Sequence, residues 1–124
     1  MLEKVNLADA FTRFSDTWSP KIAGDVNDMH VKVAKFEGAF TWHHHENEDE
    51  MFLVVAGSLR IELEDGVVEL APGEFVVIPR GVEHRPVAQP TADVLLFENA
   101  TTVNTGSADT DERTVSVLQR LTDL

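Results

Sequence analysis

The chain has 124 residues, of which 43% are hydrophobic and 26% are charged, so its size and composition suit one ordinary globular domain. Its 22 acidic residues outnumber its 10 basic ones and give a formal net charge of −12, which disfavours nucleic acid and anionic membranes as partners. The chain has no cysteine, which excludes disulfides and thiolate metal sites and leaves nitrogen and oxygen as the available metal ligands.

The N-terminal part of the chain predicts one short helix. Asn6 is a suitable helix cap, and Leu7, Ala10 and Phe11 follow it at helical spacing. Residues 1–10 lack the basic region and the apolar run of a secretion signal, and no later stretch reaches the length needed to span a bilayer. We therefore expect a cytoplasmic protein that consists of a single domain over residues 1–124.

The region from about residue 21 to about residue 100 predicts a β-barrel or sandwich. Short runs rich in β-branched and aromatic residues alternate there with turn residues, and no run is long enough for a crossover helix, which disfavours a parallel α/β sheet. Residues 101–124 are richer in Thr, Asp, Asn and Gly and predict a C-terminal arm, with an edge strand over 114–117 and a helical turn over 117–124. The predicted barrel strands are Met29–Phe36, Phe40–His45, Met51–Ala56, Leu59–Leu63, Val67–Leu70, Phe75–Ile78, His84–Ala88 and Val94–Phe97.

A run of three histidines at the end of a predicted strand is the first candidate for metal chemistry. Side chains alternate along a strand, so His43 and His45 share one face and His44 points to the other. Glu50 opens the next apolar run, where a hairpin return would bring a carboxylate back beside the two imidazoles. Two neighbouring carboxylates compete for this position, namely those of Glu48 and Asp49.

A lone histidine after a second strand and turn is the other candidate. His84 follows Pro79-Arg80-Gly81, which ends the strand that begins after Gly73. In an antiparallel barrel this strand end can lie against the first cluster. The two clusters would then form a site with three imidazoles and one carboxylate, with coordination positions left for water or a ligand.

The two clusters resemble the two signature motifs of the cupin superfamily. The first motif is matched by Gly38, His43, His45, Glu50 and Gly57, and the second by Gly73, Pro79, Gly81 and His84. The resemblance implies an all-β double-stranded β-helix, which is a jelly-roll barrel of the phosphomannose-isomerase-like kind, with a short N-terminal helix. It also implies a homodimer and one divalent transition metal ion (Fe, Mn, Ni, Zn or Cu), with the ligands His43, His45, Glu50 and His84.

The remaining conspicuous residues have simpler interpretations. We expect His44 and His30 to be surface or interface residues. Arg80 and Arg85 flank the second motif, where a guanidinium can meet an anionic substrate, although exposed turn arginines seldom have such a role. Trp42 and Phe52 are expected to point away from the ligands. Core packing or cavity lining is expected for Phe40, Met51, Leu53, Phe75, Val77 and Phe97.

Two functions fit these features. The first is a metal-dependent enzyme of the dioxygenase or the isomerase/cyclase type, acting on a small oxygenated molecule. The second is a cupin that binds or senses a small ligand without turnover. Catalysis requires an acid or base beyond the metal ligands, and the sequence offers no clear one. This absence favours dioxygen chemistry over hydrolysis or aldose isomerisation, because a metal can itself activate dioxygen.

Overall fold

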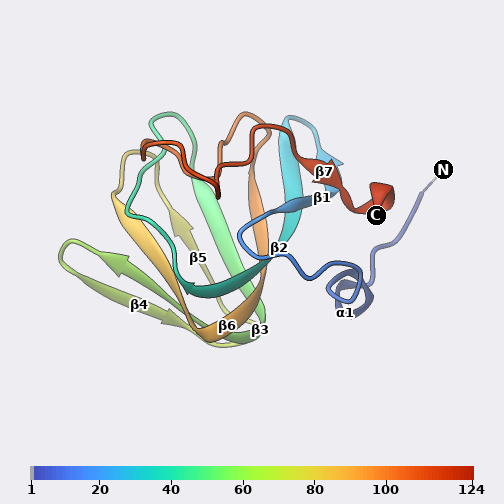
Figure 1. The fold of residues 1–124 in the computed structure, drawn as a ribbon, viewed down its shortest axis with the longest axis horizontal. Helices are drawn as coiled ribbons and strands as arrows, with labels where there is room; N and C mark the ends of the chain where they lie inside the picture. Colours follow the sequence, from blue (N-terminus) through green and yellow to red (C-terminus); the bar gives the residue numbers. More distant parts are fainter. Residues whose placement is uncertain (1) are drawn as a thin grey trace.

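Strands dominate the computed structural model, which describes residues 2–124 and has the jelly-roll barrel fold (Figure 1). The N-terminal helix is short, as predicted, and Asn6 caps it by accepting a hydrogen bond from the Asp9 backbone N–H. A 3₁₀ turn, Leu121–Asp123, follows the last strand. The elements are α1 (Leu7–Ala10), β1 (Lys21–Val26), β2 (Met29–Ala39), β3 (Glu50–Leu63), β4 (Gly66–Leu70), β5 (Phe75–Ile78), β6 (His84–Asn99) and β7 (Gln119–Arg120).

Two long antiparallel strands, β3 and β6, form the centre of the barrel. They pair with each other along most of their length, and the order of the connected strands is β4-β3-β6-β2-β1-β7, with β5 also pairing with β3. All pairs except the short β1–β7 pair are antiparallel, as predicted. The C-terminal segment, coloured red in Figure 1, runs across one end of the barrel before β7 joins β1.

Each of the two central strands unites two strands that the sequence suggested were separate. In β3 the union occurs at Gly57, where the pairing with β6 shifts its register. Gly57 has φ +84°, and an added Cβ would lie 2.3 Å from the Thr91 carbonyl oxygen. A glycine is required because β6 passes so closely. The strand therefore bends around the barrel and does not end at its turn-like residues.

Other predicted boundaries also needed correction. Residues 40–45 form no regular strand, although His43 still makes an antiparallel bridge to His84. Strand β1 was not predicted from the sequence. In the C-terminal arm the short strand is Gln119–Arg120, and residues 114–117 form no strand.

The interior of the barrel is filled by aromatic and aliphatic side chains. The Trp18 ring stacks on the rings of Phe36 and Phe40, with centroid distances of 4.3 and 4.6 Å. Val54 and Ile61 of β3 are fully buried beneath them. Outside the barrel, a second apolar cluster joins α1 to β2 and to the 3₁₀ turn, and its buried members are Ala10, Phe11, Val33 and Leu121.

Several apolar residues face in the opposite direction from the one predicted. Phe52 points inward, with its ring centroid 6.1 Å from that of His84, so the expectation that it faces away from the histidines is wrong. Phe75 and Val77 are 60% and 48% exposed, so they are not core. Two half-buried residues of β3, Met51 and Leu53, pair with Val77 and Phe75 and share their outer face. Phe97 of β6 is also half-buried and pairs with Met51 on the other side. Of the predicted set, only Phe40 is core.

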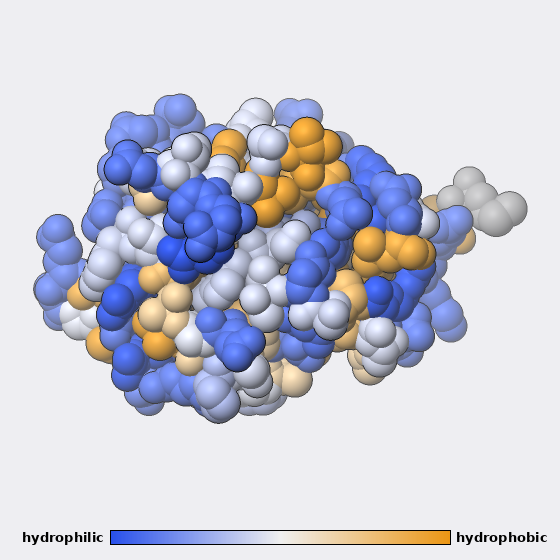
Figure 2. Space-filling view, viewed as in Figure 1, coloured by the Kyte–Doolittle hydropathy of each residue, from blue (hydrophilic) through white to orange (hydrophobic). Residues whose placement is uncertain are grey.

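The surface reflects the acidic composition. The face seen in Figure 2 is mainly hydrophilic, with separate hydrophobic groups between the charged side chains. No helix within residues 2–124 is long and apolar enough to cross a membrane.

Candidate metal centre

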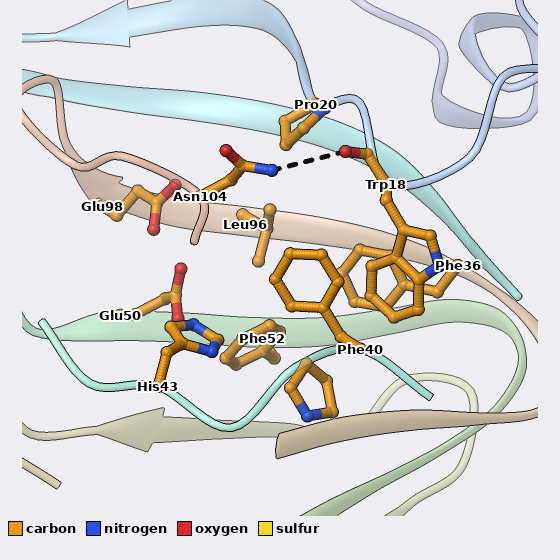
Figure 3. A pocket seen from close by; sticks show the side chains of 11 residues that line it. Trp18, Pro20, Phe36, Phe40, His43, Glu50, Phe52, Leu96, Glu98 and Asn104 are labelled. Carbon is orange, nitrogen blue, oxygen red and sulfur yellow. Dashed lines mark hydrogen bonds between the residues drawn. The ribbon is translucent and has the colours of Figure 1, made fainter. Parts of the chain in front are cut away.

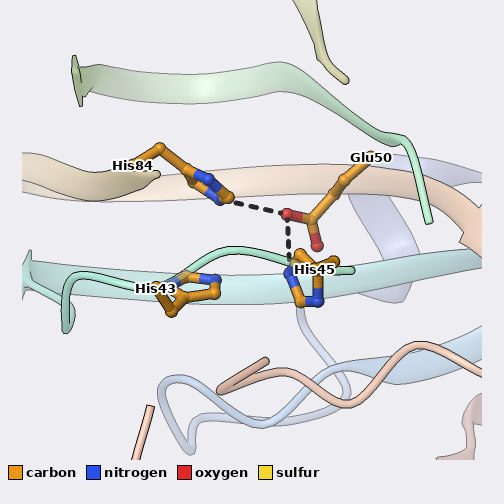
Figure 4. Close-up of side chains that lie close together, drawn as sticks. All are labelled: His43, His45, Glu50 and His84. Carbon is orange, nitrogen blue, oxygen red and sulfur yellow. Dashed lines mark ion pairs between the residues drawn. The ribbon is translucent and has the colours of Figure 1, made fainter. Parts of the chain in front are cut away.

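The four residues predicted from the two motifs meet at one point inside the barrel (Figure 4). His43, His45, Glu50 and His84 each offer one ligand atom, and these atoms lie within 4.8 Å of one another. Their side chains are buried, with residue exposures of 0–4%. The structure therefore brings together the whole predicted set of side chains.

Backbone pairing fixes the positions of these side chains. The backbone N–H of His43 donates to the His84 carbonyl at 3.0 Å, and that of His84 donates to the His43 carbonyl at 2.9 Å. The Gly81 N–H donates to the His45 carbonyl at 2.8 Å. Glu50, the first residue of β3, pairs with β5 on one side and β6 on the other. The Glu50 carboxylate does return beside the imidazoles, but not through a hairpin, because the histidine segment pairs with the start of β6 and not with β3.

Hydrogen bonds at the outer nitrogens orient two of the imidazoles. Nδ1 of His43 lies 2.9 Å from the Thr41 carbonyl oxygen, and Nδ1 of His84 lies 2.9 Å from that of Val82. A carbonyl only accepts, so in each ring Nδ1 carries the proton and Nε2 keeps its lone pair. This tautomer is the one with which Nε2 can bind a cation.

The inner atoms of the cluster fit a bound cation. Nε2 of His45, Nε2 of His84 and Oε1 of Glu50 are buried and have no hydrogen-bond partner within residues 2–124. Each of the two nitrogens lies 3.4 Å from that oxygen. Buried polar atoms without partners are costly, and one cation between them would satisfy all three. Three imidazoles and a carboxylate suit a divalent transition metal.

The electrostatic environment keeps one ligand candidate neutral. Burial and, to a lesser extent, the neighbouring His84 lower the pKa of His43 to about 4. Since only a neutral imidazole coordinates a metal, His43 is in its ligand form throughout the neutral pH range.

The competing acidic and histidine candidates lie outside this centre. His44 faces away, as predicted, with Nδ1 2.8 Å from Glu83 and Nε2 2.6 Å from Glu46. Glu48 accepts a hydrogen bond from the Thr101 hydroxyl. The remaining competitor, Asp49, accepts one from the Arg80 backbone N–H.

The flanking basic residues make their contacts outside the cluster. Arg85 donates to Glu62 and stacks over the Trp42 ring, with 5.4 Å between its guanidinium carbon and the ring centroid. Arg80 is exposed in its turn. His30 is half-buried, with Nε2 3.4 Å from Asp25, and is less exposed than a surface residue should be.

A small cavity of about 30 Å³ adjoins the four-residue cluster (Figure 3). Two members of the cluster, His43 and Glu50, form one side of the cavity, and Glu98 lies beside them. The rest of the wall is mainly apolar. It consists of Trp18, Pro20, Phe36, Phe40, Phe52, Pro86, Leu96 and Asn104.

Sequence reasoning missed a buried ion pair at this cavity. Nζ of Lys32 lies 2.9 Å from Oε1 of Glu98, and each residue is 2% exposed. Burial and the negative charge of the neighbouring Glu50 raise the pKa of Glu98 well above its usual range, although Lys32 opposes this. The signal for Glu98 is its two-residue spacing from Leu96, which is buried on the inner face of β6.

The C-terminal arm covers the histidines. A Cβ added at Gly106 would lie 2.4 Å from the His44 carbonyl oxygen and 3.0–3.1 Å from ring atoms of His43 and His45. The Ser107 N–H donates to the same carbonyl at 2.9 Å, and the Ser107 hydroxyl accepts from the His44 N–H. Asn104 carries the arm to the cavity wall. The arm thus closes the barrel over the cluster.

Known proteins are similar to this chain in sequence and architecture. The family described as Cupin domain matches residues 29–98. A cupin-2 domain protein of Shewanella frigidimarina is 40% identical in sequence and superposes with a TM-score of 0.75, covering 77% of this chain and 93% of its own. An uncharacterised Bacillus subtilis protein, YdbB, is 40% identical over 62 residues, which are 49% of this chain and 55% of that protein.

An enzyme matches over a shorter share of its length. Homogentisate 1,2-dioxygenase of Rhodopseudomonas palustris is 41% identical over 68 residues, which are 51% of this chain and 15% of the dioxygenase. The chain thus spans only part of the curated relatives that it matches. The profile match over more than half of the chain and the extensive Shewanella superposition establish that this protein belongs to the cupin domain family.

Proposed function

We propose that this protein is a metal-dependent enzyme that acts on a small oxygenated molecule. His43, His45, Glu50 and His84 hold one divalent transition metal ion, and the substrate occupies the adjoining cavity. The observation that carries the proposal is the buried convergence of four donor atoms, three of which have no partner within residues 2–124, beside a cavity.

Dioxygenase chemistry is the reaction class that we favour over isomerase or cyclase chemistry. When bound in such a site, Fe(II) or a similar ion can bind dioxygen and a substrate oxygen at its open positions. The chain's own residues hold the donors in place and surround the cavity with apolar side chains that exclude water. The similarity to part of homogentisate 1,2-dioxygenase supports this choice.

Elemental analysis tests the metal site directly. The protein is purified without added metal, and its metal content is measured beside that of the variants His43→Ala, His45→Ala and His84→Ala. We expect about one ion per chain in the parent protein and loss of most of it in each variant. Iron in the parent protein would support dioxygen chemistry. The consumption of oxygen in the presence of candidate substrates would then measure that activity.

His44→Ala is the matched control, since His44 lies in the same histidine run and contacts Glu46 and Glu83 instead of the cluster. It should keep its full metal content. If His44→Ala loses the ion while His43→Ala and His45→Ala retain it, the proposed ligand set is wrong.

The second candidate is a cupin that binds or senses a small ligand without turnover. The modest size of the cavity, about 30 Å³, favours this alternative, because it leaves little room for two reactants. Stoichiometric ligand binding by metal-loaded protein, with no product or oxygen consumption over many hours, would select it.

A further inference from the structure

We infer that Glu98, held by Lys32, is a positioning residue for Glu50. Glu98 donates a hydrogen bond from its carboxyl group to the carboxylate of Glu50, and this bond keeps the other oxygen of Glu50 beside the histidines. The inference rests on the proposed function for the metal ion that Glu50 binds. It adds two residues that belong to neither cupin motif.

Strand pairing brings the two carboxyl groups together inside the barrel. Glu50 of β3 is the direct cross-strand partner of Glu98 of β6. Side chains that are directly opposite in an antiparallel pair project from the same face, with their Cβ atoms about 5 Å apart. The two side chains are 6% and 2% exposed, and their carboxyl groups are turned toward each other (Figure 3). A side-chain hydrogen bond joins them.

One of the two carboxyl groups must supply the proton for this bond, and the contacts of Lys32 identify it as Glu98. Nζ of Lys32 donates to Oε1 of Glu98 at 2.9 Å, and Lys32 is the one lysine or arginine paired with either group within residues 2–124. Two buried carboxylates directly opposite each other would repel. Oε2 of Glu98 finds no donor among the described residues, so it carries the proton and donates to Glu50.

The bond to Glu98 leaves one oxygen of Glu50 for the imidazoles. Oε1 of Glu50 lies 3.4 Å from Nε2 of His45 and 3.4 Å from Nε2 of His84. A carboxylate that is hydrogen-bonded through one oxygen is fixed in its rotation, so Oε1 stays on the side of the imidazoles. Lys32 fixes Glu98 in turn. The series Lys32–Glu98–Glu50 thus connects β2 and β6 to the ligand at the start of β3.

Infrared spectroscopy of the metal-free protein tests the hydrogen bond itself. A protonated carboxyl group absorbs at a higher frequency than a carboxylate, and we expect this band in the parent protein at neutral pH. Glu98→Gln should lack it. The glutamine keeps the shape, an oxygen that accepts from Lys32 and an N–H that donates to Glu50, so this variant should fold as the parent does. Absence of the band from the folded parent protein would overturn the proposal.

Titration with Co(II) tests what the bond contributes to the metal centre, because the visible spectrum of Co(II) reports both its affinity and its ligand arrangement. The variant Lys32→Met with Glu98→Met exchanges a buried ion pair for apolar residues, which is often neutral or stabilising. We expect it to bind Co(II) about 10–100-fold more weakly than the parent, with an altered spectrum. Glu98→Gln should keep the parent spectrum and an affinity within about threefold of the parent.

The matched control is Lys35→Met with Asp93→Leu. Lys35 and Asp93 form a second ion pair between β2 and β6, with 3.3 Å between Nζ and Oδ1, and both are partly exposed. Each double variant removes one positive and one negative charge, so neither changes the net charge. The control should keep the Co(II) affinity of the parent. An equal loss in both double variants would assign the effect to the pairing of the two strands and overturn the proposal.

Two further Co(II) results would also overturn it. One is an unchanged affinity and spectrum in the variant that lacks Lys32 and Glu98. The other is Glu98→Gln binding as weakly as that double variant, since a neutral donor would then not replace the carboxyl group. Failure of the proposed function has a different signature: a parent protein that shows the infrared band and binds no Co(II) has the hydrogen bond but not the metal centre.

Discussion

At the scale of single residues, the contact between the arm and the histidines depends on Gly106. Its φ of +51° lies in the left-handed region, and the His44 carbonyl occupies the space that a Cβ would need. Both features oppose any other residue at this position. The arm can therefore lie against the imidazoles of His43 and His45 only because this residue has no side chain.

Gly106→Ala is expected to lower the free energy of unfolding by roughly 1–3 kcal/mol, through strain and the displacement of the arm. Urea unfolding measures the effect. Gly73→Ala separates the two causes, because Gly73 has φ +86° but open space around it. If Gly73→Ala is as costly as Gly106→Ala, close packing of the arm on the histidines contributes nothing to stability.

A metal ion held by the histidines of the cluster should stabilise the fold. A metal bound only by the folded chain stabilises it by about 2.7 kcal/mol at a hundredfold excess over its dissociation constant, so removal by a chelator should lower Tm. Protons compete with the metal for imidazole nitrogens, and the pKa of His43 is lowered to about 4. The Tm difference between loaded and metal-free protein should therefore narrow as pH falls toward 4. A difference independent of pH would argue against histidine ligands.

At the scale of elements, Lys21 of β1 connects the segment just before it to the distant strand β7. Its Nζ lies 2.7 Å from Asp16, 3.2 Å from the Ser19 hydroxyl and 2.9 Å from the Gln119 side-chain oxygen of β7. Lys21 is 1% exposed, so its charge depends on these partners. The segment before β1 and the end of the C-terminal arm are thereby joined to the same edge of the barrel.

Asp16→Asn tests how much the ion pair between Lys21 and Asp16 stabilises the fold, because the loss of stability should depend on pH. Burial by itself would raise the pKa of Asp16, but the hydrogen bond and charge of Lys21 outweigh it and hold the pKa below 3.8. The stabilisation is thus present above about pH 3.8 and is lost as pH falls through the lowered pKa. We expect Asp16→Asn to cost roughly 1 kcal/mol at neutral pH and low salt, and little in strong acid.

Chemical denaturation at several pH values measures this difference. Asp109→Asn is the control, because Asp109 is exposed and forms no ion pair with the described residues. An equal cost of Asp16→Asn at pH 7 and in strong acid would show that the ion pair with Lys21 is not its source.

At the scale of the whole molecule, the outer face of the sheet is incompletely covered. Helix α1 and the 3₁₀ turn cover only the part near Val33 and Val55. Beside it, β5, β3 and β6 carry uncharged side chains on matching cross-strand positions, which we call the outer apolar patch: Phe75, Val77, Met51, Leu53, Leu95 and Phe97. A net charge of −12 makes two copies repel, so such an uncharged surface is where they can associate.

We expect a homodimer that uses this patch in an isologous interface. Sedimentation at micromolar concentration should give twice the chain mass of 13.8 kDa. Phe75→Glu combined with Val77→Lys should yield monomers that retain their metal. Val67→Lys alters an exposed valine outside the patch and should remain dimeric. A monomeric parent protein would refute the expectation, and a dimer that survives the double change would move the interface elsewhere.

The sequence by itself determined which four residues form the cluster, because the spacing within each motif depends only on neighbouring residues, whereas the barrel brings the second motif to the first by pairing His43 with His84. His43, His45, Glu50 and His84 meet as predicted, and His44 faces away. The expectation for Phe52 was wrong although alternation holds along the first half of β3: Phe52 is two residues after Glu50, so both lie on the inner face, and Met51 lies on the outer one. Only the tertiary structure decided the Lys32–Glu98 pair, since its partners are 66 residues apart and meet through the register of β2 on β6.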